Sequence, residues 1–175
     1  MQRLHNPAYT PTMLFFSNTT AISMENKKTD APGNWFTVPT TDDNGNTIIV
    51  TGRDDVDKFR SRDRNNIRVE VSLPYTPAGS LGFPDDTTAE LLEKITDAFL
   101  SNLKGKNTAI LTGIYTGAGQ RDWVFYTFST DVFNSFLNRA LANLPQLPLK
   151  IYAENDPEWA EYTEMRAIAA DSTTE

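Results

Sequence analysis

Between residues 66 and 156 the apolar residues alternate between a period of two and a helical spacing, in the order strand, helix, strand, strand, helix, strand. This order is typical of the split βαβ, or ferredoxin-like, arrangement. Two amphipathic helices must then bury their apolar stripes on one face of a four-stranded antiparallel sheet. The sequence therefore predicts an α+β fold with a βαββαβ two-layer sandwich at its centre.

Local signals delimit each element of this unit. Strands are predicted at residues 67–73, 108–116, 122–128 and 147–151. The first helix follows a capping box in which Thr87 is the N-cap and Glu90 reaches back to it, and it ends before Gly105. Ser129 or Thr130 caps the second helix. The apolar stripes of the two helices are Leu92, Ile95 and Phe99 in the first and Phe133, Phe136, Leu137, Ala140 and Leu144 in the second.

Two further elements flank the central unit. An Asn-Gly turn at residues 44–45 joins β-rich segments at 35–40 and 47–51, which predicts an added N-terminal hairpin. Asp156, Pro157 and Glu158 make a helix start, with Asp156 as the N-cap, and Trp159 and Tyr162 share one face of the C-terminal helix that follows. We expect a single α+β domain over 34–170, a poorly ordered or loosely packed extension over 1–33, and a frayed tail over 171–175.

The predicted strand at residues 122–128 is apolar on both sides. Trp123 and Phe125 point to one face, and Val124 and Tyr126 to the other. A sheet face without helices would not normally carry such bulk. We therefore expect a cover over the second face, which is either the N-terminal hairpin, the C-terminal helix through Trp159, or a second subunit.

Composition excludes several classes of function. The net charge of −7 argues against nucleic acid and against an anionic membrane surface. No apolar run is long enough to span a bilayer, and no signal peptide is recognised, so we expect a cytoplasmic protein. The chain has no cysteine, and His5 is its single histidine, which argues against thiolate chemistry and His-dependent catalysis. Asp42 and its neighbours lack the spacing of a calcium loop. We therefore predict no metal, no cofactor and no catalytic residues.

A set of charged and aromatic residues remains as candidate contacts for a ligand or a partner. Arg121 follows a tight turn beside aromatic residues, where it could recognise a carboxylate or fix the turn through a neighbouring acid. Asp156 serves either as a helix cap or as a binding group. The candidates are Arg121, Asp122, Trp123, Phe125, Asp156, Trp159 and Tyr162.

The hairpin at residues 115–127 (YTGAGQRDWVFYT) and the segment at 156–162 (DPEWAEY) resemble the bacterial family catalogued as domain of unknown function 695. Trp35 and the strand at 69–75 also fit that family, and the resemblance covers residues 34–165. It implies no established activity. Some members are joined to, or similar in fold to, the regulator B of ribonuclease E, an acidic ferredoxin-like inhibitor, which implies a regulatory role by analogy only.

Three functions stay open, and a non-enzymatic one is favoured. The first is a protein-binding domain, with a homodimer as one form of it. The apolar face around Trp123 and Phe125 motivates this hypothesis. The second is a small-molecule-binding domain or weak carboxylate-based enzyme, with its site between the sheet and the N-terminal hairpin or the C-terminal helix. A pocket of about 300 Å³ or more, with polar groups such as Arg121 and Asp156, would indicate it. The third is nuclease regulation through an acidic surface.

Overall fold

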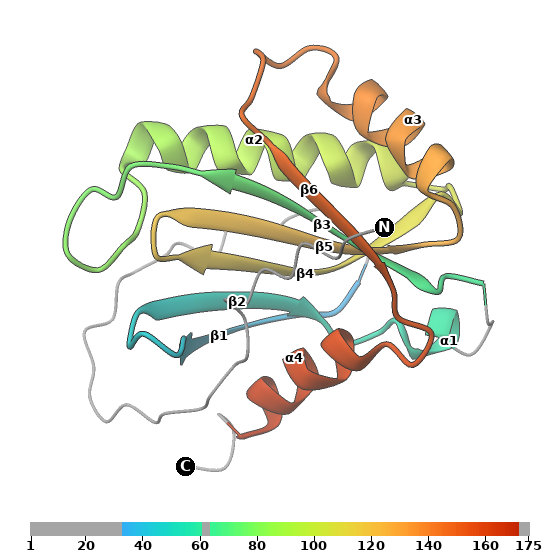
Figure 1. The fold of residues 1–175 in the computed structure, drawn as a ribbon, viewed down its shortest axis with the longest axis horizontal. Helices are drawn as coiled ribbons and strands as arrows, with labels where there is room; N and C mark the ends of the chain where they lie inside the picture. The colour runs from blue at the N-terminus through green and yellow to red at the C-terminus, as the bar shows by residue number, and fades with distance from the viewer. Residues whose placement is uncertain (1–32, 61–63, 172–175) are drawn as a thin grey trace.

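The fold is known from a computed structural model that describes residues 33–60 and 64–171 (Figure 1). The predictions of a loosely packed extension over 1–33 and a frayed tail over 171–175 lie outside the described residues, apart from the single positions 33 and 171.

Six strands form one antiparallel sheet in the order β1-β2-β4-β5-β3-β6. The strands are β1 (Trp35–Thr41), β2 (Thr47–Arg53), β3 (Ile67–Pro74), β4 (Ala109–Gly117), β5 (Gln120–Thr127) and β6 (Lys150–Asn155). The predicted N-terminal hairpin is β1 and β2. It does not cover a face but widens the sheet, because β2 pairs along the edge of β4, with Val50 opposite Tyr115.

Helices lie on both faces of the sheet, which confirms the predicted α+β fold and adds a third layer. The helices are α1 (Asp57–Arg60), α2 (Asp86–Leu103), α3 (Thr130–Leu141) and α4 (Ala160–Asp171). Figure 1 shows α2 and α3 together on one side of the sheet and α4 on the opposite side.

The core between the sheet and the α2 and α3 helices is aromatic. The Phe99 ring meets the rings of Trp123 and Phe125 edge-on, with centroids 5.5 and 5.4 Å away. Trp123 donates its indole N–H to Thr96 Oγ1 at 2.9 Å, so its one polar atom is satisfied. The predicted stripes are confirmed, since Leu92, Ile95, Phe99, Phe133, Phe136, Leu137 and Ala140 are all buried in this core.

The second face is covered by α4, the second of the three covers considered. Trp159 is buried and stacks on Tyr126, with ring centroids 4.0 Å apart and an angle of 11° between the planes. The hypothesis that Trp123 and Phe125 offer an apolar face to a second subunit is wrong. Both side chains are fully buried on the face covered by α2 and α3, so that motive for a homodimer disappears.

Two glycines make a depression in the sheet for the Met165 side chain of α4. Gly52 on β2 lies opposite Gly113 on β4. A Cβ atom would stand 2.8 Å from the Met165 sulfur at Gly52 and 2.5 Å from it at Gly113, closer than packed atoms come. Helix α4 therefore approaches the sheet closely here because neither position carries a side chain.

Three predicted boundaries are wrong. Helix α2 is capped by Asp85, whose carboxylate accepts the Thr88 N–H at 2.8 Å, rather than by Thr87. Helix α4 begins at Ala160, three residues later than a cap at Asp156 implies. Strand β6 begins at Lys150 instead of 147. The predicted Ser129 cap of α3 is confirmed by its bond from the Val132 N–H.

Candidate functional site

A small cavity of about 70 Å³, lined by both charged and apolar side chains, lies between the sheet, the β1–β2 hairpin and α4. This is the place that the small-molecule hypothesis anticipated for a site. Its polar lining comes from five elements and the turn after β1: Thr40, Thr41, Asp42, Arg68, Glu70, Tyr115, Asp122, Glu161 and Glu164. Val124, Met165 and Ile168 supply apolar walls.

Strand pairing brings the central cavity residues together. Tyr115 on β4 lies opposite Asp122 on β5, and Glu70 on β3 lies opposite Val124. Arg68 and Glu70 are two apart on β3, so their side chains share the face that α4 covers. The polar half of the alternating β3 pattern therefore points into the cavity.

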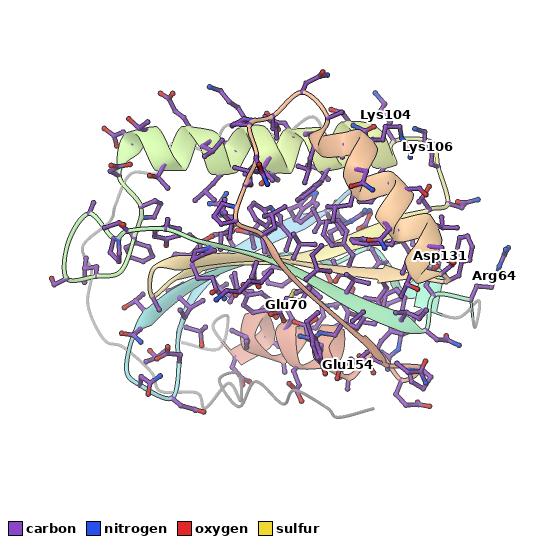
Figure 2. The ribbon with its side chains drawn as sticks, turned by 45° about the horizontal axis from the view of Figure 1, so that its top comes forward. Arg64, Glu70, Lys104, Lys106, Asp131 and Glu154 are labelled. Atoms are coloured by element: carbon purple, nitrogen blue, oxygen red, sulfur yellow. The ribbon has the colours of Figure 1, made fainter. Side chains whose placement is uncertain are left out.

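Arg68 is the central cation of the site. It forms ion pairs through Nη2 with Glu70 Oε2 at 2.6 Å and through Nη1 with Glu154 Oε1 at 2.5 Å. Tyr152 donates its hydroxyl to the other Glu154 oxygen at 2.8 Å. Figure 2 shows Glu70 and Glu154 on the side of the sheet that faces α4. Both terminal nitrogens of Arg68 are thus occupied by carboxylates.

Three residues that line this cavity each have one buried polar atom without a hydrogen-bond partner. The atoms are Glu161 Oε2, Arg68 Nε and Thr41 Oγ1, and in the part of the chain that the structure describes only the Trp35 indole nitrogen shares this condition. Glu161 as a residue keeps some exposure, but its Oε2 is shielded from solvent, while Tyr115 donates its hydroxyl to Oε1. An unpaired buried polar atom costs about 1–3 kcal/mol. We therefore expect a polar molecule in the cavity.

Burial governs the protonation of the site. It raises the pKa of Glu161 to about 7, helped by repulsion from Glu70 and Glu164 and opposed by the Tyr115 hydrogen bond and by Arg68. Burial also raises the pKa of Glu70, and the nearby Asp122 adds to this effect. The pKa of Tyr115 lies well above 10.0 because of burial and the Glu161 carboxylate. Near neutral pH, Glu161 is therefore poised between its two forms.

Replacing Glu161 with glutamine is expected to stabilise the fold at alkaline pH. The pKa of Glu161 is raised from 4.5 to about 7, so its stabilising contribution is fully present below 4.5 and is lost as the pH rises through 7. A pKa difference of one corresponds to about 1.4 kcal/mol, so the rise from 4.5 to about 7 predicts a gain of about 3 kcal/mol for Glu161→Gln at pH 8. Urea unfolding at pH 8 and pH 4.5 measures this. Equal gains at both values would contradict the raised pKa.

The sequence-predicted contact residues divide between the two faces of the sheet. Asp122 lines the cavity, but Arg121 lies on the opposite side and forms an ion pair with Glu93 at 2.8 Å. Arg121 also donates to Thr116 Oγ1 at 2.8 Å. Of the two roles considered for Arg121, the contacts therefore fit the one in which it fixes the turn of the hairpin through a neighbouring acid. Trp123 and Phe125 belong to the core.

Asp156, Trp159 and Tyr162 fix α4 to the sheet. The Asp156 carboxylate accepts hydrogen bonds from the Tyr126 hydroxyl at 2.6 Å and from the Ala160 N–H at 2.9 Å. Asp156 therefore anchors the start of α4 to the sheet, although this residue precedes the helix. Trp159 donates its indole N–H to the Asn65 carbonyl at 2.9 Å. Tyr162 is buried beside Trp159. These three residues position Glu161 without lining the cavity themselves.

Sequence reasoning missed Arg68, Glu70, Tyr115 and Glu161. The β3 alternation did place Arg68 and Glu70 on one face, but it did not tell that a helix covers that face. Tyr115 is the only aromatic residue in its strand, whose other polar residues are two threonines, and this was an available signal. Glu161 carried none, because a glutamate in a first helical turn is common for electrostatic reasons alone.

A second hollow is larger than the cavity but has a different lining. It measures about 350 Å³ and lies between the end of β3, the start of α2 and the segment before β6. Its lining is mainly apolar and contains neither Arg121 nor Asp156. Neither of these two pockets therefore combines a volume of about 300 Å³ or more with Arg121 and Asp156, so neither is the pocket that the small-molecule hypothesis expected.

The described ranges, 33–60 and 64–171, contain no group of three or more His, Cys, Asp or Glu side chains arranged to hold a metal ion. No helix in these ranges is long and apolar enough to cross a membrane.

Comparison with known proteins gives one match. The model of a family of unknown function, DUF695, matches residues 33–165. No curated protein and no solved structure matches the chain. The matched range includes the sheet, α1 to α3, and α4 as far as Met165, so it contains most of the cavity lining.

Proposed function

Since this chain belongs to the DUF695 family, whose function is unknown, we propose a function from the geometry of the cavity: it is a binding domain for a small organic cation. The observation that carries the proposal is Glu161, which lines the cavity and whose Oε2 atom is shielded from solvent and has no hydrogen-bond partner. A bound ammonium group would supply the missing hydrogen bond and the opposite charge at once.

The charge of the lining supports a cation over an anion. Five acids, Asp42, Glu70, Asp122, Glu161 and Glu164, line the cavity, against Arg68 as its single basic residue. The terminal nitrogens of Arg68 are already paired with Glu70 and Glu154. An anion would therefore meet a lining with more acidic than basic residues, whereas a cation meets a favourable potential.

The remaining unpaired atoms indicate a second group on the ligand. Arg68 Nε is a donor, and Thr41 Oγ1 can donate or accept. A hydroxyl group can accept from Arg68 Nε and also bond to Thr41 Oγ1. Ethanolamine is therefore the probe of choice, and ethylene glycol is its neutral counterpart of nearly the same shape. With about −1.5 kcal/mol per heavy atom as a ceiling, four heavy atoms give a Kd no lower than tens of micromolar.

We expect ethanolamine to bind with a millimolar or sub-millimolar Kd and ethylene glycol to bind at least tenfold more weakly (about 1.4 kcal/mol). A cation prefers the ionised carboxylate, and the pKa of Glu161 is about 7. The ionised fraction rises about tenfold from pH 6 to pH 8, so affinity should rise by about the same factor. Chemical-shift titration of the backbone amides measures both comparisons.

Glu161→Gln should abolish this binding and its pH dependence. Glu158→Gln is the matched control, since it makes the same charge change three residues away on an exposed turn. Equal affinity for ethanolamine and ethylene glycol, or unchanged binding in Glu161→Gln, would overturn the proposal.

We further propose that β3 to β6, with α2 and α3, have the ferredoxin-like connectivity. The strand order β4-β5-β3-β6, with antiparallel neighbours throughout, supports it. The two crossover helices on one face support it as well (Figure 1). We also propose a cytoplasmic location, which the absence of cysteine supports.

A further inference from the structure

We propose that two copies of this chain pair through β6, antiparallel about a two-fold axis at Tyr152, so that their sheets join into one. Strand β6 ends the sheet order, and it pairs with β3 along one side only, from Lys150 opposite Ser72 to Asn155 opposite Ile67. Along its other side no strand of the described residues lies. The backbone N–H and C=O groups along the outer side of such an edge strand are a template for pairing with another strand.

The side chains of β6 are unusually open. All six of its residues are exposed, including Ile151 at 50% and Tyr152 at 42%. These are two of the four large apolar residues that the structure leaves exposed among the described residues. Neither α2 and α3 nor α4 extends over this strand, so both of its faces are open to a neighbour.

The opposite edge of the sheet is unsuited to pairing. Strand β1 carries Pro39 in its middle, which has no N–H to donate to a neighbouring strand. Strand β6 has no proline, and its register with β3 runs without a shift. A chain that extends its sheet would therefore do so at β6.

The charges of β6 complement each other in one register. Tyr152 lies opposite Glu70, so the period of two places Lys150, Tyr152 and Glu154 on the face that α4 covers. A two-fold axis at Tyr152 sets Lys150 opposite Glu154 of the second copy, and this happens twice. A lysine on an edge normally discourages pairing, but here it meets the opposite charge.

The Glu154 carboxylate has room for this contact. One oxygen accepts from Arg68 and the other from Tyr152. A carboxylate offers about four acceptor sites, so a lysine of the second copy adds a bond without displacing either. Moving the axis by half a residue to either side sets Lys150 opposite Asn155 or Ala153 and loses both ion pairs. On the other face of the sheet, the Tyr152-centred register sets Ile151 opposite Ala153.

Light scattering of the full chain tests the association. We expect a mass that rises with concentration from 19.6 kDa toward twice that value. Lys150→Glu sets like charges opposite each other at two places and should weaken the dimer by about tenfold or more. Lys106→Glu, on the exposed loop after α2 (Figure 2), makes the same charge change and should leave the dimer intact.

Cysteine cross-linking tests the register, because the chain has no cysteine of its own. Facing residues of antiparallel strands have Cα atoms about 4.5–5.5 Å apart, within disulfide range. Tyr152→Cys should therefore form a dimer under mild oxidation. Ala153→Cys should not form this disulfide dimer, because the two copies of residue 153 would be offset along the strands. The exposed Lys106→Cys should not form it either.

Hydrogen exchange of the β6 amides distinguishes the other possible cover. Protection that grows with protein concentration supports pairing between copies. Protection that is independent of concentration, in a chain that stays at 19.6 kDa, would show that the same chain covers the edge and would overturn the proposal. Equal cross-linking at Tyr152→Cys and Ala153→Cys would overturn the register.

Discussion

Replacing Trp159 with alanine is expected to lower the free energy of unfolding by about 3–5 kcal/mol, the usual cost of deleting a buried tryptophan. The side chain is 1% exposed and stacks on Tyr126 at 4.0 Å. Its indole N–H reaches the Asn65 carbonyl, so it also holds the loop before β3. Denaturation in urea, followed by far-UV circular dichroism, measures the loss.

Trp159→Phe is the matched control for this loss. Phenylalanine keeps a ring against Tyr126 but cannot donate to Asn65, so it should cost about 1–2 kcal/mol through the unpaired carbonyl and the smaller ring. The difference between the two variants reports the packing of α4 on the sheet. If alanine cost no more than phenylalanine, the stacked ring would not be what holds the helix in place.

Replacing Arg68 with methionine should cost about 3–5 kcal/mol at pH 8, since it leaves partly buried carboxylates without their cation. Arg68 is paired with both Glu70 and Glu154 and also lowers the pKa of Glu161. Its loss raises the pKa of Glu70 and Glu161 further. Because protonation relieves the remaining repulsion, the cost should be smaller at pH 5 than at pH 8. Urea unfolding at the two pH values measures it.

A second substitution separates lost charge pairing from lost packing. In Arg68→Met with Glu70→Gln, one of the stranded carboxylates becomes neutral, so part of the loss at pH 8 should return. Should the double variant be no more stable than Arg68→Met alone, the arginine would act through its apolar stem and not through its charge.

The sequence predicts most of the central fold because each element carries a local signal. Leu92, Ile95 and Phe99 fall on one helical face, and the alternation at Ile67 to Leu73 marks a strand. Two of the three wrong boundaries are helix starts, where several residues compete, and the third is the start of β6. Asp85 and Thr87 are both good caps, and only the neighbouring backbone decides between them. Trp159 takes a φ of +54°, a conformation that no local pattern foretells.

The candidate site was largely beyond sequence reasoning because it is assembled from distant segments. Glu161 contacts Tyr115, 46 positions away, and Arg68 contacts Glu154, 86 positions away. No spacing rule links such residues. Of the predicted contacts only Asp122 lines the cavity, while the aromatic residues that drew attention are needed for packing. The site forms because the fold buries charged residues that usually lie on the surface. Their burial depends on how the whole chain packs, so no short segment predicts it.

The shallow depression formed by Gly52 and Gly113 has an evolutionary consequence. Since Met165 occupies the space of both missing side chains, together with the Phe36 ring at Gly52, these positions should vary together among relatives of this chain. A relative with alanine at either strand position should carry a shorter residue in place of the methionine, and one that keeps both glycines is free to keep the long thioether. Such correlated substitution would be visible in aligned genomes without any measurement on the protein.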